Sequence, residues 1–157
     1  MAYYSESNFN PENSIGYLLR RSEQLGSAVL EPIFVAAGIT KTQWSALAAL
    51  HFNRASTCAE IARDLCHDKG ATTRLVDTLE ERGWVMRDRD GGEDRRVVRL
   101  TLTPAGEGIA GTVRDAVIRV WNHWLSDWNE KDITDLIRLL QRLRDTVQQA
   151  PDEGVFA

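Results

Sequence analysis

A short segment in the middle of the chain, residues 68–77, carries hydrogen-bond donors at helical spacing. At about 100° per residue, its apolar residues gather on one side of a helix and its polar residues on the other. The polar side and its N-terminal tip comprise Lys69, Gly70, Thr73, Arg74 and Asp77. The forked guanidinium of Arg74 matches the O6 and N7 atoms of guanine, and Gly70 lets the backbone approach closely. The segment predicts a helix that enters a DNA major groove, while a solvated amphipathic face explains it equally well.

An arginine-rich stretch follows at residues 87–99. Arginine and aspartate alternate before the pair Gly91–Gly92, and two acidic and two arginine residues follow it, a pattern that is typical of a turn between two strands. Arginines on a thin β-hairpin can enter a narrow minor groove, where the negative potential is strongest. The interleaved aspartates can hold each guanidinium in one rotamer before DNA arrives. The alternative is a self-neutralising charged turn on the protein surface.

Hydrophobic periodicity predicts the elements that position these two segments. The expected helices begin after Ser14, after Thr40 or Thr42, after Ser56 or Thr57, after Asp68, after Pro104 and after Asn129. The first helix should reach at least Glu31 and kink or end at Pro32, and the fourth should end with Gly83 in the C′ position. Two strands are expected at 84–86 and 97–102. The fold class is therefore mainly α with one β-hairpin wing, a winged helix-turn-helix set in a helical region.

Composition excludes several classes of protein. At 157 residues with 43% hydrophobic residues, the chain suits one soluble globular domain. It has no run of about 18 apolar residues, and its N-terminus lacks the apolar core of a secretory signal, so we expect a cytoplasmic protein with no membrane contact. The net charge is −4, and residues 54–99 hold equal numbers of basic and acidic side chains. Any DNA affinity must therefore come from the placement of charges.

The cysteines and histidines predict neither a disulfide nor a metal site. Cys58 and Cys66 are both expected in the third helix, about 12 Å apart along its axis, which is too far for a disulfide. Both are expected to be buried as small apolar residues. Together with His51 and His67 they match no common zinc spacing, so no cofactor is expected. The chain also lacks a G-x-S-x-G motif, a phosphate-binding glycine loop and an H-E-x-x-H motif, so the sequence does not predict an enzyme.

Taken together, the two central segments resemble the MarR family of bacterial transcription regulators. Residues 68–74, followed by Gly83-Trp84-Val85, are similar to the recognition helix of that family and the turn behind it. The wing pattern D-x-R-x-x-x-L-x-L-T appears from Asp94 to Thr103. The resemblance extends over nearly the whole chain and implies a homodimeric repressor, less often an activator, that a small molecule releases from DNA. It implies dimerisation helices at 1–38 and 104–157 around a DNA-binding region at 39–103.

The expected partner is double-stranded DNA. A two-fold dimer with one recognition helix per subunit needs a near-palindromic operator whose half-sites lie about one helical turn apart. The candidate DNA-binding residues are Ser56, Thr57, Lys69, Gly70, Thr72, Thr73, Arg74, Asp77, Arg89, Asp94, Arg95 and Arg96.

The resemblance also implies a ligand site between the dimerisation helices and the winged region. An aromatic acid there needs a flat apolar slot and one cation for its carboxylate, with Arg20 as first choice and Arg21 as second. The candidate ligand-binding residues are Tyr17, Arg20, Arg21, Trp44, His51, Trp121 and Trp124. The alternative is that the tryptophans belong to the core and the arginines are solvated or pair with Glu23 or Glu31.

Two further functions stay open at this point. One is a regulator of the same type that has no small-molecule ligand. The other is a winged-helix protein that binds another protein instead of DNA. The neutral charge of residues 54–99 favours the second, whereas Thr73, Arg74 and Arg96 argue against it.

Overall fold

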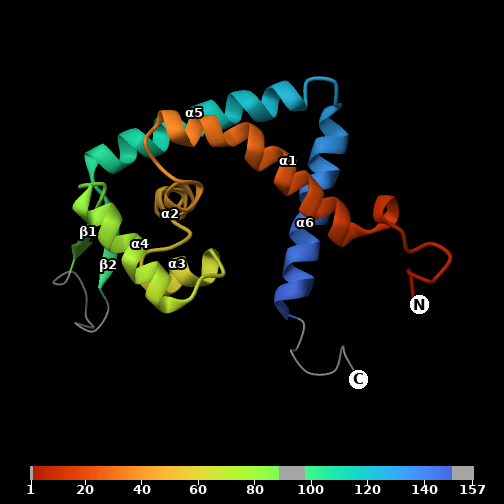
Figure 1. Ribbon diagram of the computed structural model, residues 1–157, viewed down its shortest axis with the longest axis horizontal. Coiled ribbons are helices and arrows are strands. Elements are labelled where there is room, and N and C mark those ends of the chain that lie inside the picture. Colours follow the sequence, from red (N-terminus) through yellow and green to blue (C-terminus); the bar gives the residue numbers. More distant parts are fainter. Residues whose placement is uncertain (1, 89–97, 150–157) are drawn as a thin grey trace. The chain divides into compact units, whose positions relative to one another are not determined.

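The computed structural model describes residues 2–88 and 98–149, and in these ranges the chain is mainly α with one antiparallel hairpin, as predicted (Figure 1). A short 3-10 helix at Pro11–Asn13 precedes the first α-helix. The helices are α1 (Ile15–Ala36), α2 (Lys41–His51), α3 (Cys58–Asp64), α4 (Lys69–Glu81), α5 (Pro104–Trp124) and α6 (Glu130–Gln149). The strands are β1 (Val85–Asp88) and β2 (Arg99–Leu102). The chain divides into two compact units, Met1–Ile118 and Arg119–Ala157.

Most helices begin and end where the sequence predicts. Thr40 and Gln43 form a reciprocal capping box at the start of α2. The side chains of Asp68 and Asn129 accept backbone hydrogen bonds from the first turns of α4 and α6. Gly83 follows the last turn of α4 with a φ of 69°, a left-handed conformation that glycine adopts without strain. These ends are local, so they can be predicted from residue type alone.

One of the two outcomes expected at Pro32, the end of the helix, does not occur, and the predicted extent of the third helix is wrong. The first helix does not end at Pro32 but continues to Ala36. Pro32 and Ala28, whose carbonyl loses its helical donor, are both exposed, so water can satisfy that carbonyl. The third helix ends at Asp64, which leaves Cys66 outside it, exposed and with a φ of 51°. The backbone N–H of His67 donates to Ala62 O in the turn that follows, and this turn leads the chain into α4.

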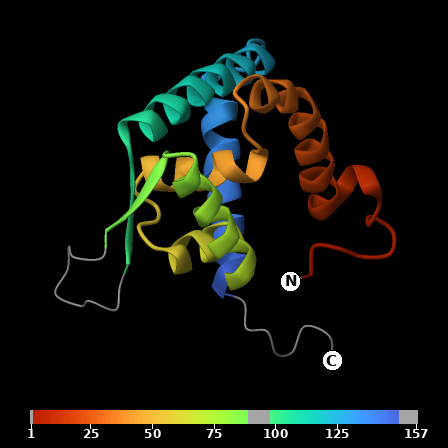
Figure 2. The same ribbon diagram turned by 60° about the vertical axis from the view of Figure 1, so that its left-hand side comes forward.

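The two strands begin one and two residues later than expected, and the second ends at Leu102 as predicted. Val85 pairs with Leu102 and Asp88 with Arg99 in an antiparallel register. The strands predicted at 84–86 and 97–102 therefore correspond to β1 and β2, with shifted ends. In Figures 1 and 2, β1 runs beside α4 and β2 beside α2, in agreement with the contacts between these elements. The hairpin is thus attached to the helices at its base.

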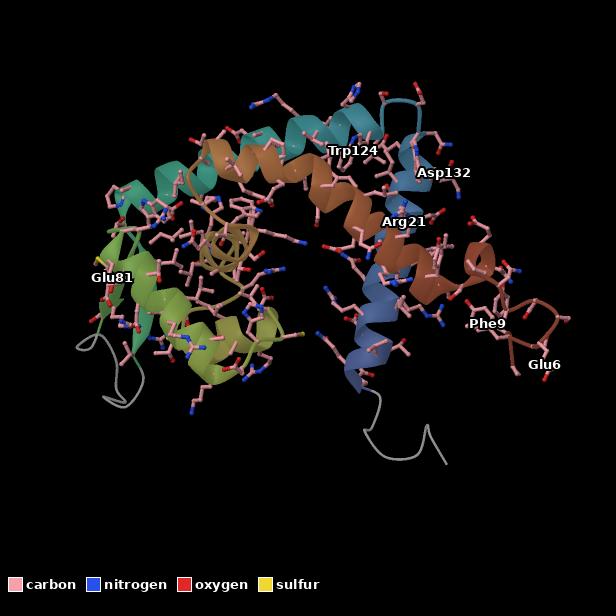
Figure 3. The ribbon with its side chains drawn as sticks, in the orientation of Figure 1. Glu6, Phe9, Arg21, Glu81, Trp124 and Asp132 are labelled. Atoms are coloured by element: carbon pink, nitrogen blue, oxygen red, sulfur yellow. The ribbon has the colours of Figure 1, made fainter. Side chains whose placement is uncertain are left out.

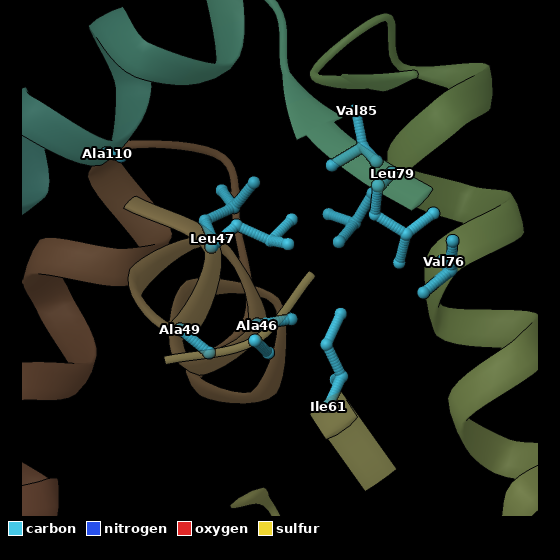
Figure 4. Close-up of a cluster of buried hydrophobic side chains, with 11 residues drawn as sticks. Ala46, Leu47, Ala49, Ile61, Val76, Leu79, Val85 and Ala110 are labelled. Atoms are coloured by element: carbon cyan, nitrogen blue, oxygen red, sulfur yellow. The ribbon is translucent and has the colours of Figure 1, made fainter. Parts of the chain in front are cut away.

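A compact core fixes α4 in place (Figure 4). Leu47 of α2, Ile61 of α3 and both Val76 and Leu79 of α4 have no exposed surface, and Val85 of β1 is 2% exposed. Complete burial of a side chain of this size stabilises the fold by about 1.5–3 kcal/mol. The core therefore holds one face of α4 against three other elements and leaves the opposite face uncovered.

The outer helices differ from this core. Of the described residues of α1, Phe34 alone is buried, and none of the residues of α6 is. Both helices are amphipathic and expose long apolar stripes. The exposed large apolar residues are Ile15, Leu18, Leu19, Leu25, Val29 and Val35 on α1, and Leu136, Ile137, Leu139, Leu140 and Val147 on α6.

None of the described helices is long and apolar enough to cross a membrane by itself. Only α1 and α2 taken together reach that length and composition, and they are bent by 83° at their junction.

Candidate functional site

The uncovered face of α4 presents the polar residues predicted from the sequence. Lys69, Gly70, Thr73 and Arg74 are all exposed, whereas Val76 and Leu79 on the other side are buried. The Thr73 hydroxyl donates to Lys69 O at 2.9 Å, so in this structure it is available to other groups as an acceptor and not as the predicted donor. A methyl group on Gly70 would lie 3.3 Å from the Asp68 carboxylate, so a side chain at this position would crowd the residue that caps α4.

Asp68 holds the N-terminus of α4. Its Oδ1 accepts from Ala71 N at 2.9 Å. This backbone hydrogen bond, more than the nearby charges of Arg74 and His67, lowers the pKa of Asp68 below its ordinary value of 3.8. The carboxylate is therefore ionised at neutral pH and stabilises the first turn of the exposed helix.

Thr72 does not lie on this exposed face. It is fully buried, and its hydroxyl donates to Asp68 O at 3.0 Å. The prediction that Thr72 contacts DNA is therefore wrong, because its side chain is enclosed in the core and cannot reach a duplex. The helical period already placed it on the apolar side.

An ion-pair cluster joins the hairpin to the edge of α4. The guanidinium of Arg87 on β1 donates to Asp77 Oδ1 at 2.5 Å and also pairs with Glu80. Burial opposes the charge, but the hydrogen bond to Asp77 and the two negative charges outweigh it and raise the pKa of Arg87. The carboxylate of Asp77 is therefore already bonded within the protein. This role of Arg87 was not predicted from the sequence, although the spacing of Asp77 and Glu80 on one helix face is a visible signal.

Ser56 and Thr57 are half-buried and form the start of α3. Thr57 Oγ1 accepts from Glu60 N at 3.2 Å. The Glu60 carboxylate accepts from Ser56 N at 2.6 Å and from its hydroxyl at 3.0 Å, and these bonds lower the pKa of Glu60 below 4.5. Both residues thus have structural partners inside the loop. Arg99 Nη1 on β2 lies 3.5 Å from the Ser56 hydroxyl, which places one exposed cation beside this loop.

The tip of the hairpin lies outside the described residues. This range includes the DNA-binding candidates Arg89, Asp94, Arg95 and Arg96.

The candidate ligand residues occupy several different environments. The Arg20 guanidinium lies 5.7 Å from the ring centre of Tyr17 on α1, and Arg21 is exposed (Figure 3). Trp44 is partly buried and packs against the hydrophobic core. This position agrees with the alternative that Trp44 is a core residue. In the second unit, the rings of Trp121 and Trp124 meet edge to face at 5.1 Å. Among the described residues, the contacts therefore bring together Arg20 with Tyr17 and Trp121 with Trp124.

His51 bonds to charged groups on α5. Its Nδ1 lies 2.6 Å from Glu107 Oε2, and its Nε2 lies 3.3 Å from Arg114 Nη1. A neutral ring that donates from Nδ1 and accepts at Nε2 satisfies both contacts.

An open cavity of about 390 Å³ adjoins His51. Its walls are Leu50, His51, Asn53, Ala55, Ser56, Arg99, Leu100, Thr101, Leu102 and Glu107. His51 alone among the ligand candidates lines this cavity. Its mixed polar wall does not match the flat apolar slot expected for an aromatic acid. Among the described residues, no group of three or more His, Cys, Asp or Glu side chains could hold a metal ion.

Comparisons with known proteins find a family profile, curated relatives and similar solved structures. The MarR family profile matches residues 39–98. The multiple antibiotic resistance protein MarR of Salmonella typhimurium is 32% identical over 101 residues, which cover 64% of this chain and 69% of the relative. The transcriptional repressor MprA of Escherichia coli K12 is 29% identical over 126 residues, which cover 76% of this chain and 69% of that protein. The crystal structure of NadR in complex with 4-hydroxyphenylacetate has a TM-score of 0.77 at 24% identity and covers 91% of this chain and 97% of that one.

Proposed function

The chain belongs to the MarR family of transcriptional regulators, and from this premise we propose that it is a DNA-binding repressor that acts as a homodimer and leaves DNA when it binds a small aromatic acid or phenol. The main support for DNA binding is the exposed polar face of α4, which has Arg74 at its centre and a buried core behind it. We expect no enzymatic activity, because the relatives named above are regulators of transcription or of antibiotic resistance.

Charge placement supports a contact with DNA in spite of the neutral composition of the region. On α4, Asp77 and Glu80 are both paired with Arg87, which removes much of their repulsion toward phosphates. Lys69 and Arg74 are exposed on the same helix, and among the described residues neither forms an ion pair. The N-terminal half of α4 therefore presents two cations, whereas the carboxylates of Asp77 and Glu80 are held by Arg87 further along the helix.

The DNA-binding test is a titration of the upstream DNA of the gene with the protein, at several salt concentrations. We expect a near-palindromic site to bind more tightly than random duplex, with affinity that falls steeply as salt rises. The variant Arg74→Ala should lose about 1–3 kcal/mol of affinity for this site. The matched control Arg142→Ala removes an exposed arginine from α6 and should have little effect. Equal binding of all duplexes by the wild type would refute sequence-specific recognition.

The proposed effector class rests on relatives and on Arg20. NadR was crystallised with 4-hydroxyphenylacetate, an aromatic acid, and this supports the same class of effector here. Arg20 is exposed on α1 beside the ring of Tyr17, so a cation and an aromatic surface lie together. A carboxylate can pair with the guanidinium while its ring packs on neighbouring apolar groups. Trp44, Trp121 and Trp124 stay in the proposal as further wall residues.

A panel of benzoates, hydroxybenzoates and cinnamates tests this part. At millimolar concentration, at least one member should weaken operator binding and change tryptophan fluorescence. Arg20→Ala should abolish the release and leave operator binding intact, with Arg21→Ala as the second variant. DNA and ligand must weaken each other by the same factor. If every compound fails while operator binding is normal, the protein is a regulator without an aromatic effector. If the protein binds no DNA but captures a protein partner, the protein-interaction alternative holds.

A further inference from the structure

The turn that follows α4, residues 82–84, contacts three other elements of the same compact unit. Gly83 reverses the chain with its positive φ. The half-buried ring of Trp84 packs against the core that contains Leu79 and against a second cluster of buried residues, Phe34, Ile39 and Val113. This turn connects the exposed helix α4 to β1. Its contacts therefore influence the direction in which α4 leaves the core.

On one side the turn is fixed rigidly to the junction of β2 and α5. Thr103 Oγ1 donates to Gly83 O at 2.6 Å, and Thr103 N donates to Trp84 O at 3.0 Å. Gly106 in the first turn of α5 lies so close that a methyl group on it would be 2.0 Å from Trp84 O. Because two hydrogen bonds hold the backbone of Gly83 and Trp84 and the buried Gly106 packs directly against Trp84 O, this side of the turn leaves little room for adjustment.

On the other side the turn contacts the end of α1 through the packing of Trp84 against the cluster that contains Phe34 and through one exposed side chain, Arg82. Arg82 Nη1 donates to Gly38 O at 2.6 Å, just beyond the last turn of α1. The guanidinium also lies 4.8 Å from the ring centre of Trp84. Arg82 is exposed, so its side chain can be replaced without opening the core.

We propose that residues 82–84 form a joint that sets the orientation of α4 relative to α1 and α5, and that Arg82 is the positioning residue on the α1 side. The inference rests on the proposed DNA-binding function. In a two-fold dimer, the distance between the two α4 helices depends on how each is held by its own outer helices. Arg82 is the exposed, replaceable contact of the turn with the α1 side, next to the partly buried packing of Trp84. We therefore expect Arg82 to influence the half-site spacing that the dimer accepts.

The experiment measures operator affinity as a function of half-site spacing. Three duplexes place the half-sites about 9, 10 and 11 bp apart, around one helical turn. We expect the wild type to prefer one spacing by about tenfold or more, and Arg82→Ala to reduce this preference to about threefold or less. Arg82→Lys keeps a donor for Gly38 O and should retain most of the preference. Glu81→Ala, an exposed change in the last turn of the same helix, should retain it fully.

Two measurements separate positioning from folding. The melting temperature of Arg82→Ala should stay within about 4 °C of the wild type, because surface substitutions have small effects on stability. A larger fall, or an unchanged spacing preference in Arg82→Ala, overturns the proposal. If the wild type binds no operator, the proposed function fails, and amide hydrogen exchange then tests the joint. Faster exchange confined to residues 36–40 and 82–84 in Arg82→Ala supports the joint, and unchanged exchange overturns it.

Discussion

The winged region and the outer helices use apolar residues in opposite ways. In the winged region, large side chains from α2, α3, α4 and β1 are buried within one chain. On α1 and α6, apolar residues of the same types are largely exposed in the single chain, although both helices have a regular apolar stripe. Stripes of this length on a soluble protein mark surfaces that another molecule covers. The winged region therefore has its core within one chain, whereas the exposed stripes of α1 and α6 support the proposal that a second subunit packs on them.

The largest effect should come from a charge placed on the apolar stripe of α6. Leu140→Asp puts a carboxylate where we expect the second subunit to pack, so the dimer should dissociate at micromolar concentration. Loss of the paired recognition helices should weaken operator binding by about 100-fold or more. Size-exclusion chromatography with light scattering measures the first effect, and fluorescence anisotropy measures the second.

The control for this prediction is Thr134→Asp. Thr134 is exposed on α6 and lies about 120° around the helix from Leu140. This variant should stay dimeric and keep operator affinity. If Leu140→Asp is also dimeric and fully active, the exposed stripe of α6 is not an interface. The difference in burial between the winged region and α6 would then not reflect dimer formation.

A core substitution sharpens the same contrast. Leu47→Ala removes a side chain with no exposed surface and should lower the free energy of unfolding by about 2–5 kcal/mol. Because the cavity lies within one chain, this loss should not depend on protein concentration. Leu18→Ala on the exposed stripe of α1 should instead change stability mainly at low concentration, where the dimer dissociates. Urea unfolding at two protein concentrations distinguishes the cases, and equal behaviour of both variants would contradict the prediction.

Two glycines of α5 give a smaller and more local test. Gly106→Ala forces a methyl group against the carbonyl of Trp84 and should lower stability by about 1–3 kcal/mol. Gly108→Ala meets nothing within 4 Å and should raise stability by about 0.5–1 kcal/mol, because alanine favours the helix. Thermal unfolding of both variants measures the difference. Equal effects would mean that the close contact between α5 and the turn after α4 relaxes easily.

The sequence predicted the elements whose signals are local. Thr40, Asp68 and Asn129 cap their helices, and Gly83 ends α4, because each effect depends on one or two neighbouring residues. The end of α3 was missed because Cys66 adopts a left-handed conformation that is rare for residues other than glycine. Helical periodicity separated exposed Arg74 from buried Thr72, yet similarity of the motif placed both among the DNA contacts.

Contacts between distant segments could not be predicted in the same way. The pairing of Arg87 with Asp77 and Glu80 depends on how the hairpin lies on α4, and the hydrogen bond from Arg82 to Gly38 O depends on how α4 meets α1. The spacing of Asp77 and Glu80 indicates that one cation could bridge them, but a single sequence does not show which cation reaches them. The ligand residues are a harder case, since Trp121 and Trp124 belong to one compact unit and the other five candidates to the other. Their assignment stays a prediction.

The smallest expected effect concerns the N-terminus of α4 and its dependence on pH. The pKa of Asp68 is lower in the folded protein than its ordinary value of 3.8, mainly because of the hydrogen bond from Ala71 N. Its contribution to stability is therefore present above that ordinary value and is lost as the pH falls through the lower, folded-state pKa. Asp68→Asn keeps the capping oxygen but does not titrate, so its melting temperature should fall less than that of the wild type between about pH 5 and pH 3. Asp68→Ala should melt at a lower temperature at every pH, because it removes the cap. Identical acid profiles for the wild type and Asp68→Asn would show that the cap does not depend on the charge of this carboxylate.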